Sequence, residues 1–280
     1  EPYDEHTGKG ILRHVIGRIG QSGWMIILVT ATEYLPHQEK WVEKLTERIP
    51  QIETIVHNVN GKRTNVILGP KNNILYGEGT ITDHIKDLQF TLSPHSFFQV
   101  NPEQTTVLYD QALEYADLKG YETVIDAYCG TGTISLFLAH KAKHVIGIEI
   151  VEPAIINARE NAKRNGYDNT EFIVGDAAVE MPKLYKAGVR PDVIVFDPIR
   201  AGCKEEVLTS AAGMEPKRIV YVSCNPATMA RDIEILTHYG YELQEVQPVD
   251  MFPMTAHVEA CCLLVRESSN DDELVSIKVD

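Results

Sequence analysis

Cys224 is the side chain in this sequence best placed to act as a nucleophile. It follows an apolar, strand-like run, Ile219–Val222, and precedes Asn225 and Pro226, which open a predicted helix. The carboxyl end of a parallel strand borders the ligand crevice of an open α/β sheet, and a helix N-terminus can lower the pKa of a nearby thiol. A lone cysteine is more often a buried packing residue, but the turn after Cys224 favours a reactive thiol.

Acidic residues end four successive strand-like runs in the second half of the chain. They are Asp126, Glu149, Asp176 and Asp197. Carboxylates at one edge of a parallel sheet are hard to explain as solvated surface charge, and they predict a polar ligand there. A carboxylate in the position of Glu149 can accept hydrogen bonds from both hydroxyls of a ribose, and Asp176 can meet an adenine amino group.

Gly130 and Gly132 lie between the first of these runs and a predicted helix. They let the backbone turn sharply and approach a ligand closely at the helix N-terminus. Dinucleotide-binding proteins use a similar turn, and a purely structural turn is the alternative. The sequence reads Gly-Thr-Gly-Thr and lacks the pyrophosphate fingerprint, so it favours a ligand without phosphates, such as S-adenosylmethionine.

Two side chains near the C-terminus compete for the role of a general base. Glu259 stands directly before an apolar, strand-like run, where an acid is as often a solvated strand end as a functional group. His257 is a base by residue type, or it orients the loop. The residues alone leave these readings open.

The other cysteines are read as structural. Cys129 is expected to pack in the glycine turn, Cys261 and Cys262 lie in an apolar run, and Cys203 fits either a surface or a packing role. Five cysteines without a CxxC pair favour a reducing compartment over a disulfide framework. The absence of paired Cys/His clusters predicts no metal site.

Regular alternation of apolar runs and helical patterns begins near residue 101. The expected strands are Thr123–Ala127, His144–Ile148, Glu171–Val174, Val193–Phe196 and Arg218–Val222, followed by Glu242–Val249 and an antiparallel Val258–Val265 at or near an edge. Helices are expected over residues 102–117, 133–140, 152–165, 204–212 and 226–239. Apolar strands joined by helices indicate a doubly wound, mostly parallel, Rossmann-like α/β domain.

The first part of the chain has a different pattern. Strands are expected at Ile11–Ile19, Trp24–Thr30, Ile52–Asn58 and Asn65–Ile67, around one helix at His37–Arg48. This pattern indicates a small α+β domain over residues 1–92, which precedes the α/β domain over residues 93–280.

Composition is that of an ordinary globular protein. The 280 residues are 44% hydrophobic and 24% charged, and no apolar run approaches the ~20 residues that cross a bilayer. We expect a cytoplasmic protein with no membrane partner, and a monomer. The net charge of -14 speaks against a dedicated nucleic-acid-binding domain, so any RNA must meet a local basic patch or a segment outside this chain.

Five motifs together resemble the RNA uracil-5-methyltransferases, which act on ribosomal RNA and on the T-loop of transfer RNA. They are Ser93-Pro-His-Ser-Phe-Phe-Gln-Val-Asn101, Asp126-Ala-Tyr-Cys-Gly-Thr-Gly132, Asp197-Pro-Ile-Arg200, Ser223-Cys-Asn-Pro226 and His257-Val-Glu259. The motifs cover residues 93–267 in the family's order, and the bacterial ribosomal-RNA branch is the most similar. The resemblance implies a class I methyltransferase domain and an RNA substrate, with ribosomal RNA favoured over transfer RNA.

The resemblance also implies residue roles. Cys224 would be the nucleophile that adds to carbon 6 of uracil, and Glu259 the general base that removes the proton from carbon 5. The implied contacts with S-adenosylmethionine are Gln99, Tyr128, Glu149 and Asp197, with Thr133 and Asp176 as weaker candidates.

The sequence departs from the family pattern in two ways. Ile199 stands where the family usually has a second proline, which leaves Asp197 and Arg200 in place. Family members usually begin with a small RNA-binding barrel, the TRAM domain, and many carry cysteines for a [4Fe-4S] cluster before the point where this chain starts. We therefore expect a fragment, and no cluster within these residues.

Three other functions remain alternatives. Exocyclic-nitrogen methyltransferases typically have an aromatic residue in the motif that here ends in Arg200, and RNA cytosine-5 enzymes usually use two cysteines. A non-catalytic module that binds the cofactor and RNA is the third, but an intact Cys224 and Glu259 speak against it.

Overall fold

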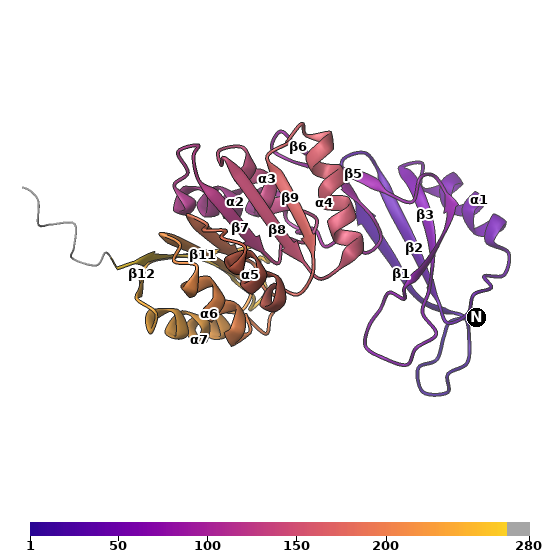
Figure 1. The fold of residues 1–280 in the computed structure, drawn as a ribbon. Coiled ribbons are helices and arrows are strands. Elements are labelled where there is room, and N and C mark those ends of the chain that lie inside the picture. The colour runs from indigo at the N-terminus through magenta and orange to yellow at the C-terminus, as the bar shows by residue number, and fades with distance from the viewer. Residues whose placement is uncertain (268–280) are drawn as a thin grey trace, which may run out of the picture. The chain divides into compact units, whose positions relative to one another are not determined.

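The computed structural model describes residues 1–267, which divide into two compact units (Figure 1). The first unit is Glu1–Phe98, and the second begins at Gln99. The predicted domain boundary, after residue 92, lies slightly earlier, at the end of the last strand of the first unit.

The first unit contains a four-stranded sheet and a separate hairpin. Its elements are β1 (Leu12–Ile19), β2 (Trp24–Thr30), α1 (Gln38–Arg48), β3 (Ile52–Val59), β4 (Lys71–Tyr76), β5 (Ile81–Ile85) and β6 (Leu88–Leu92). The sheet has the order β1-β2-β3-β4, in which only the β2–β3 pair is parallel. That pair is connected through α1, and Leu28 and Ile55 form part of the core beneath it, with Val42 and Leu45 of the helix packed against the cluster.

The predicted strand Asn65–Ile67 is wrong. These residues lie in the loop between β3 and β4, where the Asn60 carboxamide donates to the carbonyl oxygens of Val66 and Ile67 (2.7 and 2.9 Å). A side chain therefore takes the bonds that a neighbouring strand would have made.

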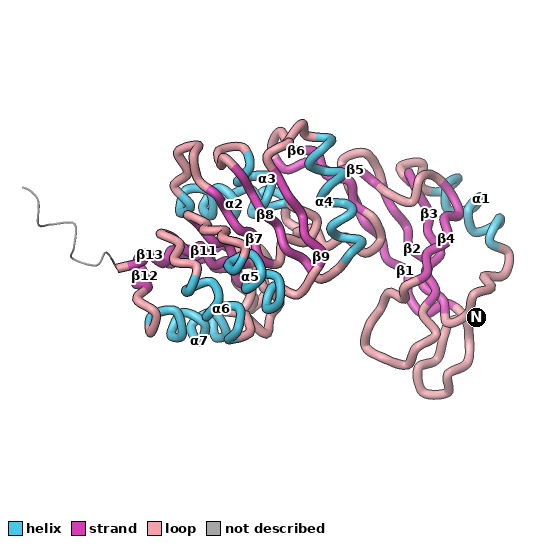
Figure 2. Tube along the Cα trace, viewed as in Figure 1, coloured by secondary structure: helices cyan, strands magenta, loops and turns pink. Residues whose placement is uncertain are grey.

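The second unit is an α/β domain (Figure 2). Its elements are α2 (Pro102–Ala116), β7 (Thr123–Ala127), α3 (Thr133–Ala139), β8 (His144–Glu149), α4 (Glu152–Arg164), β9 (Thr170–Val174), α5 (Ala177–Lys186), β10 (Val193–Phe196), α6 (Glu205–Gly213), β11 (Arg218–Ser223), α7 (Pro226–Thr237), β12 (Tyr241–Val249) and β13 (Glu259–Arg266). The sheet order is β12-β13-β11-β10-β7-β8-β9.

Strands β7 to β11 are parallel, and most of their residues are buried, except in the edge strand β9, where only Phe172 is buried. In Figure 1, α6 and α7 cover the opposite side of the sheet from α2 and α3. The chain order reverses between β7 and β10, which end in register at Ala127 and Phe196. Such a switch point opens a crevice beyond the carboxyl ends of the strands. The doubly wound sheet predicted from the sequence is confirmed, including an antiparallel final strand, β13, which lies one position from the edge.

Candidate active site

The turn after β7 is bonded to the end of β8. The backbone N–H groups of Tyr128 and Cys129 donate to the Ile148 carbonyl oxygen (2.9 and 3.0 Å). The two carboxylate oxygens of Glu149 accept from the N–H groups of Gly130 (3.3 Å) and Val151 (2.9 Å). These bonds fix the Glu149 side chain at the crevice and leave each oxygen a further lone pair for a ligand hydroxyl.

Asp126 is fully buried at the end of β7. The Ser135 hydroxyl donates to its Oδ2 (2.5 Å), and Oδ1 has no protein partner. Burial raises the pKa of this carboxyl group to about 7. A buried polar atom without a partner marks a position where a ligand donor fits, so Asp126 joins the candidate site although the resemblance assigns it no contact.

Asp176 lies at the carboxyl end of β9, as predicted, but both of its oxygens already have partners. Oδ1 accepts from the Ala178 N–H (3.0 Å) as the N-cap of α5, and Oδ2 accepts from the Lys204 ammonium (2.6 Å). The bond to Lys204 holds the pKa of the carboxyl group below its usual value. Each oxygen keeps a further lone pair, as in Glu149, so contact with an adenine amino group is compatible with that ion pair.

The remaining predicted cofactor contacts occupy varied surroundings. Gln99 is buried just before α2. Tyr128 is half-buried and has a φ of 72°, a left-handed conformation that turns the chain away from β7. The hydroxyl group of Thr133, the first residue of α3, lies 3.1 Å from that of Tyr109.

Asp197 follows β10 directly, beside the turn after β7. Burial is the main reason that the pKa of its carboxyl group rises to about 8, and the negative charges of Glu259 and Asp126 raise it further. Asp197 is therefore close enough to both of these carboxyl groups, which come from separate motifs, for their charges to affect it.

Cys224 and Glu259 occupy matching positions at one end of the β11–β13 pair. The antiparallel register runs up to Ser223 opposite Ala260, so Cys224 and Glu259 are the next residues along it. Glu259 is only 3% exposed, and burial raises its pKa, an effect that the nearby Arg200 charge opposes. The sheet register thus brings together two residues that are far apart in the sequence.

The expectation of a lowered thiol pKa is wrong. Burial raises the pKa of Cys224, the negative charge of Glu259 raises it further, and the positive charge of Arg200 partly offsets both. The N-terminus of α7 is capped by Asn225, whose Oδ1 accepts from the Ala227 N–H (3.2 Å). The thiol therefore lies close to the charges of Glu259 and Arg200. The N-cap of α7 is not Cys224 but the residue after it, Asn225.

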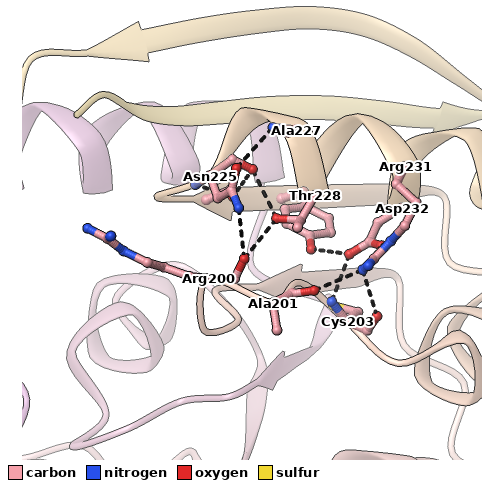
Figure 3. A network of polar contacts seen from close by, with 10 residues as sticks. Arg200, Ala201, Cys203, Asn225, Ala227, Thr228, Arg231 and Asp232 are labelled. Carbon is pink, nitrogen blue, oxygen red and sulfur yellow. Dashed lines mark hydrogen bonds and ion pairs between the residues drawn. The ribbon is translucent and has the colours of Figure 1, made fainter. Parts of the chain in front are cut away.

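The loop after β10 is fastened to the start of α7 (Figure 3). The Arg200 carbonyl oxygen accepts from the Asn225 carboxamide (3.0 Å) and from the Thr228 hydroxyl (3.2 Å). In Figure 3 the guanidinium of Arg200 points away from this network. The backbone thus fixes the two motifs to each other, while the charged end of Arg200 stays available.

Asp232 anchors the rest of that loop and is fully buried on α7. Its Oδ2 accepts from the Cys203 N–H (2.7 Å) and the Tyr221 hydroxyl (2.6 Å), and its Oδ1 accepts from the Arg231 guanidinium (2.6 and 2.8 Å). Arg231 also donates to the carbonyl oxygens of Ala201 and Cys203 (3.0 and 3.2 Å). Sequence analysis missed Asp232, although an acid on the apolar face of a helix is the signal that could have revealed it.

The structure gives the surroundings of two residues, His257 and Cys203, whose roles the sequence left open. His257 is exposed, and its ring packs edge-on against Phe252 (centroids 6.3 Å apart). Phe98 packs on Phe90 (centroids 5.8 Å apart), whereas Phe97 is 71% exposed. Cys203 has a packing role, because it is buried.

Two negative findings concern residues 1–267. No cluster of three or more His, Cys, Asp or Glu side chains in this part of the chain could hold a metal ion. No helix within it is long and apolar enough to cross a membrane.

The opposing charges around Cys224 predict a pH-dependent reactivity. Because the thiolate is the nucleophile and the Arg200 charge lowers the thiol pKa, Arg200→Gln should move the alkylation profile of Cys224 to higher pH and slow the reaction near neutrality. The measurement is the rate of iodoacetamide modification of the Cys224 peptide by mass spectrometry. Arg190→Gln, which removes an exposed charge elsewhere, is the control; a shift equal to the control would remove Arg200 from the thiol environment.

Comparison with known proteins places this arrangement in a family. The model of the tRNA (uracil-5-)-methyltransferase family matches residues 27–267. An uncharacterized RNA methyltransferase of Halalkalibacterium halodurans is 56% identical over 264 residues, which are 94% of this chain and 58% of that protein. One of Clostridium acetobutylicum is 54% identical over 270 residues, with shares of 95% and 58%. The chain thus spans less than three-fifths of the length of these relatives.

Solved structures agree with this placement. The Pyrococcus abyssi tRNA (uracil-54, C5)-methyltransferase in complex with S-adenosyl-L-homocysteine has a TM-score of 0.77 and 30% identity, over 93% of this chain and 61% of that one. Wild-type Trm5b of the same organism shares the fold, with a TM-score of 0.59 and 17% identity over 90% and 75% of the chains. The sheet order, the motifs and the family match support one conclusion: this chain belongs to the tRNA (uracil-5-)-methyltransferase family.

Proposed function

We propose that the chain carries the catalytic part of an enzyme that methylates carbon 5 of a uridine in RNA, with S-adenosylmethionine as methyl donor. The observation that carries the proposal is the pairing of Cys224 with the buried Glu259 beside Arg200. A nucleophile and a base on one face of a planar ring are what covalent activation of this carbon requires.

The residues at the crevice fit S-adenosylmethionine. The fixed carboxylate of Glu149 suits ribose hydroxyls, and the unpartnered Asp126 oxygen suits a polar donor of the ligand. A Cβ atom added at Gly130 would meet nothing within 4 Å, so the turn there leaves open space. Gln99, Tyr128, Asp197, Thr133 and Asp176 remain the proposed further contacts. When bound, the cofactor supplies an electrophilic methyl group.

The protein's own groups account for the other steps. The Cys224 thiolate adds to carbon 6 of uracil, which gives carbon 5 the nucleophilic character of an enolate. The Arg200 charge stabilises that thiolate against the nearby carboxyl groups. After carbon 5 takes the methyl group, Glu259 removes its proton, the carbon 5–carbon 6 double bond re-forms, and the thiolate leaves. Burial raises the pKa of Glu259, which moves it toward the value that suits a general base near neutral pH.

We propose ribosomal RNA as the first target to test and the T-loop of transfer RNA as the second. The Pyrococcus abyssi tRNA (uracil-54, C5)-methyltransferase favours the second, while similarity to the bacterial ribosomal-RNA branch favours the first. The experiment incubates each RNA fraction, taken from cells that lack the gene, with cofactor tritiated in its methyl group. Digestion to nucleosides should place the label in 5-methyluridine, and label in a methylated cytidine or purine would overturn the proposal.

The cofactor assignment makes a prediction about Glu149. Glu149→Ala should weaken binding of S-adenosylhomocysteine by about 1–3 kcal/mol, because charge-assisted hydrogen bonds to the ribose are lost. Titration calorimetry without RNA measures this directly. Glu160→Ala, which removes an exposed charge from α4, is the matched control; equal affinities for the two variants would take Glu149 out of the site.

A further inference from the structure

The loop between β3 and β4, residues 60–70, is held from below by buried side chains, and we call it the anchored loop. Asn60, which is 3% exposed, binds the carbonyl oxygens of Val66 and Ile67 through Nδ2, and its Oδ1 accepts from the Lys62 N–H (3.2 Å). Asn58, fully buried, both donates to and accepts from the backbone of Gly69 (2.7 Å each).

Two further side chains complete the support. Arg13, whose side chain is 2% exposed, donates to the carbonyl oxygens of Asn60 (2.9 Å) and Lys62 (2.7 Å). The His95 ring nitrogen lies 3.0 Å from the Gly69 carbonyl oxygen. A Cβ atom at Gly69 would lie 1.8 Å from the Val59 carbonyl oxygen, so the loop closes tightly on the strand. Buried amides and a buried guanidinium are costly groups to leave unsatisfied, and they hold one conformation of an exposed segment.

In this conformation the anchored loop exposes positive charge to solvent. Lys62 and Arg63 are exposed, and neither forms an ion pair within the part of the chain that the structure describes. Residues 54–77 contain three cations and no carboxylate, and the third cation, Lys71, is paired with Glu33 (3.0 Å).

The loop stands out against the charge of the whole chain. Residues 1–98 carry 10 Lys and Arg against 11 Asp and Glu, whereas the rest of the chain carries 16 against 29. The acidic excess therefore belongs to the second unit, and the first unit is close to neutral. Two exposed cations without an ion-pair partner make a local basic site for a polyanion in this nearly neutral unit.

We propose that the anchored loop is an RNA contact in which Lys62 and Arg63 bind backbone phosphates. The inference rests on the proposed function, because that function supplies the polyanion. Several of the loop's own polar backbone groups are already bonded to the protein, so the side-chain charges carry the contact. The rigid backbone lowers the ordering cost of binding.

The test measures binding of the full chain to a fluorescein-labelled, uridine-containing single-stranded RNA over a series of KCl concentrations. Each phosphate contact contributes about 0.7 to the slope of log K against log salt for a single strand. Lys62→Gln combined with Arg63→Gln should therefore make the slope shallower by about 1.4 and weaken binding at low salt. Lys62→Arg with Arg63→Lys should preserve the slope.

The control removes the same charge from the same unit. Lys40→Gln combined with Lys44→Gln neutralises two exposed cations of α1 and should leave the slope at the wild-type value. Asn60→Ala keeps both loop cations but releases the backbone, so it should weaken binding with little change in slope and make the loop more sensitive to protease. The proposal would be overturned if the Lys62→Gln, Arg63→Gln variant kept the wild-type slope, or if the α1 control changed the slope by the same amount. The anchored loop would then be tested as a binding site for a protein.

The result can be separated from the proposed function. RNA binding is measured without cofactor, so it does not depend on methyl transfer. The loop variant should still form 5-methyluridine at saturating RNA, with a raised KM and a nearly unchanged kcat. Failure of the wild-type chain to form 5-methyluridine would count against the proposed function, whereas the salt slope alone decides the role of the loop.

Discussion

Glu259→Gln should leave the protein covalently joined to its RNA. Thiol addition and methyl transfer do not need the base, but carbon 5 then keeps its proton and Cys224 cannot be expelled. The adduct should survive denaturing electrophoresis and already contain the new methyl group, while turnover falls by about 10²–10⁴-fold. Tritiated cofactor and a gel-shift of the denatured protein measure both properties in one reaction.

Two controls show whether the adduct results from loss of the base at position 259. Wild-type protein should form the same adduct only with RNA that contains 5-fluorouridine, where carbon 5 has no removable proton. Glu242→Gln, an exposed acid on β12, should turn over normally. Normal turnover by Glu259→Gln would move the base to another side chain, and His257, although exposed, would be tested next.

Cys224→Ala should abolish methyl transfer while both substrates still bind. Without a thiolate, carbon 5 is not activated, and loss of a nucleophile lowers the rate by at least about 10⁴-fold in enzymes that use one. No adduct should form, even with 5-fluorouridine RNA. Calorimetry with S-adenosylhomocysteine should give wild-type affinity, because the proposed cofactor contacts lie outside β11.

A second thiol supplies the matched control. Cys203→Ala removes a buried thiol, but Asp232 and Arg231 bind only the backbone of that residue, so alanine keeps those bonds. Because the thiol also interacts with the hydroxyl groups of Tyr128 and Tyr221, the rate of this variant should fall slightly, and far less than that of Cys224→Ala. If Cys224→Ala still forms 5-methyluridine, the covalent mechanism is wrong; if Cys203→Ala is equally inactive, loss of activity reflects packing.

The central sheet could be predicted because its strands are short apolar runs separated by helical patterns. Thr123–Ala127 and Val193–Phe196 were predicted with the bounds that the structure gives them. Helix α5 was missed, since Pro182 lies inside its second half and argues against a helix. The two hairpin strands β5 and β6 were missed as well, because five residues each give too short an alternation to recognise.

The site was only partly predictable. Residue types and motif order point to Cys224 and Glu259, but the β11–β13 register that places them together is a tertiary fact. The direction of the thiol pKa was predicted wrongly for the same reason, since the sequence shows neither the burial of the thiol nor how near the Glu259 charge lies. The network around Asp232 also depends on a loop folding back onto a helix.

Helix α7 holds the loop after β10 at two points that are spaced by about one turn of the helix. Thr228 and Asp232 are four residues apart, so they project from one helix face, and they hold successive points of the loop after β10. Inserting a single residue between them would rotate Asp232 by about 100° about the helix axis and leave its carboxylate facing away from Cys203. Substitutions on the outer face of α7 are therefore compatible with the site, whereas changes in the length of its first two turns are not.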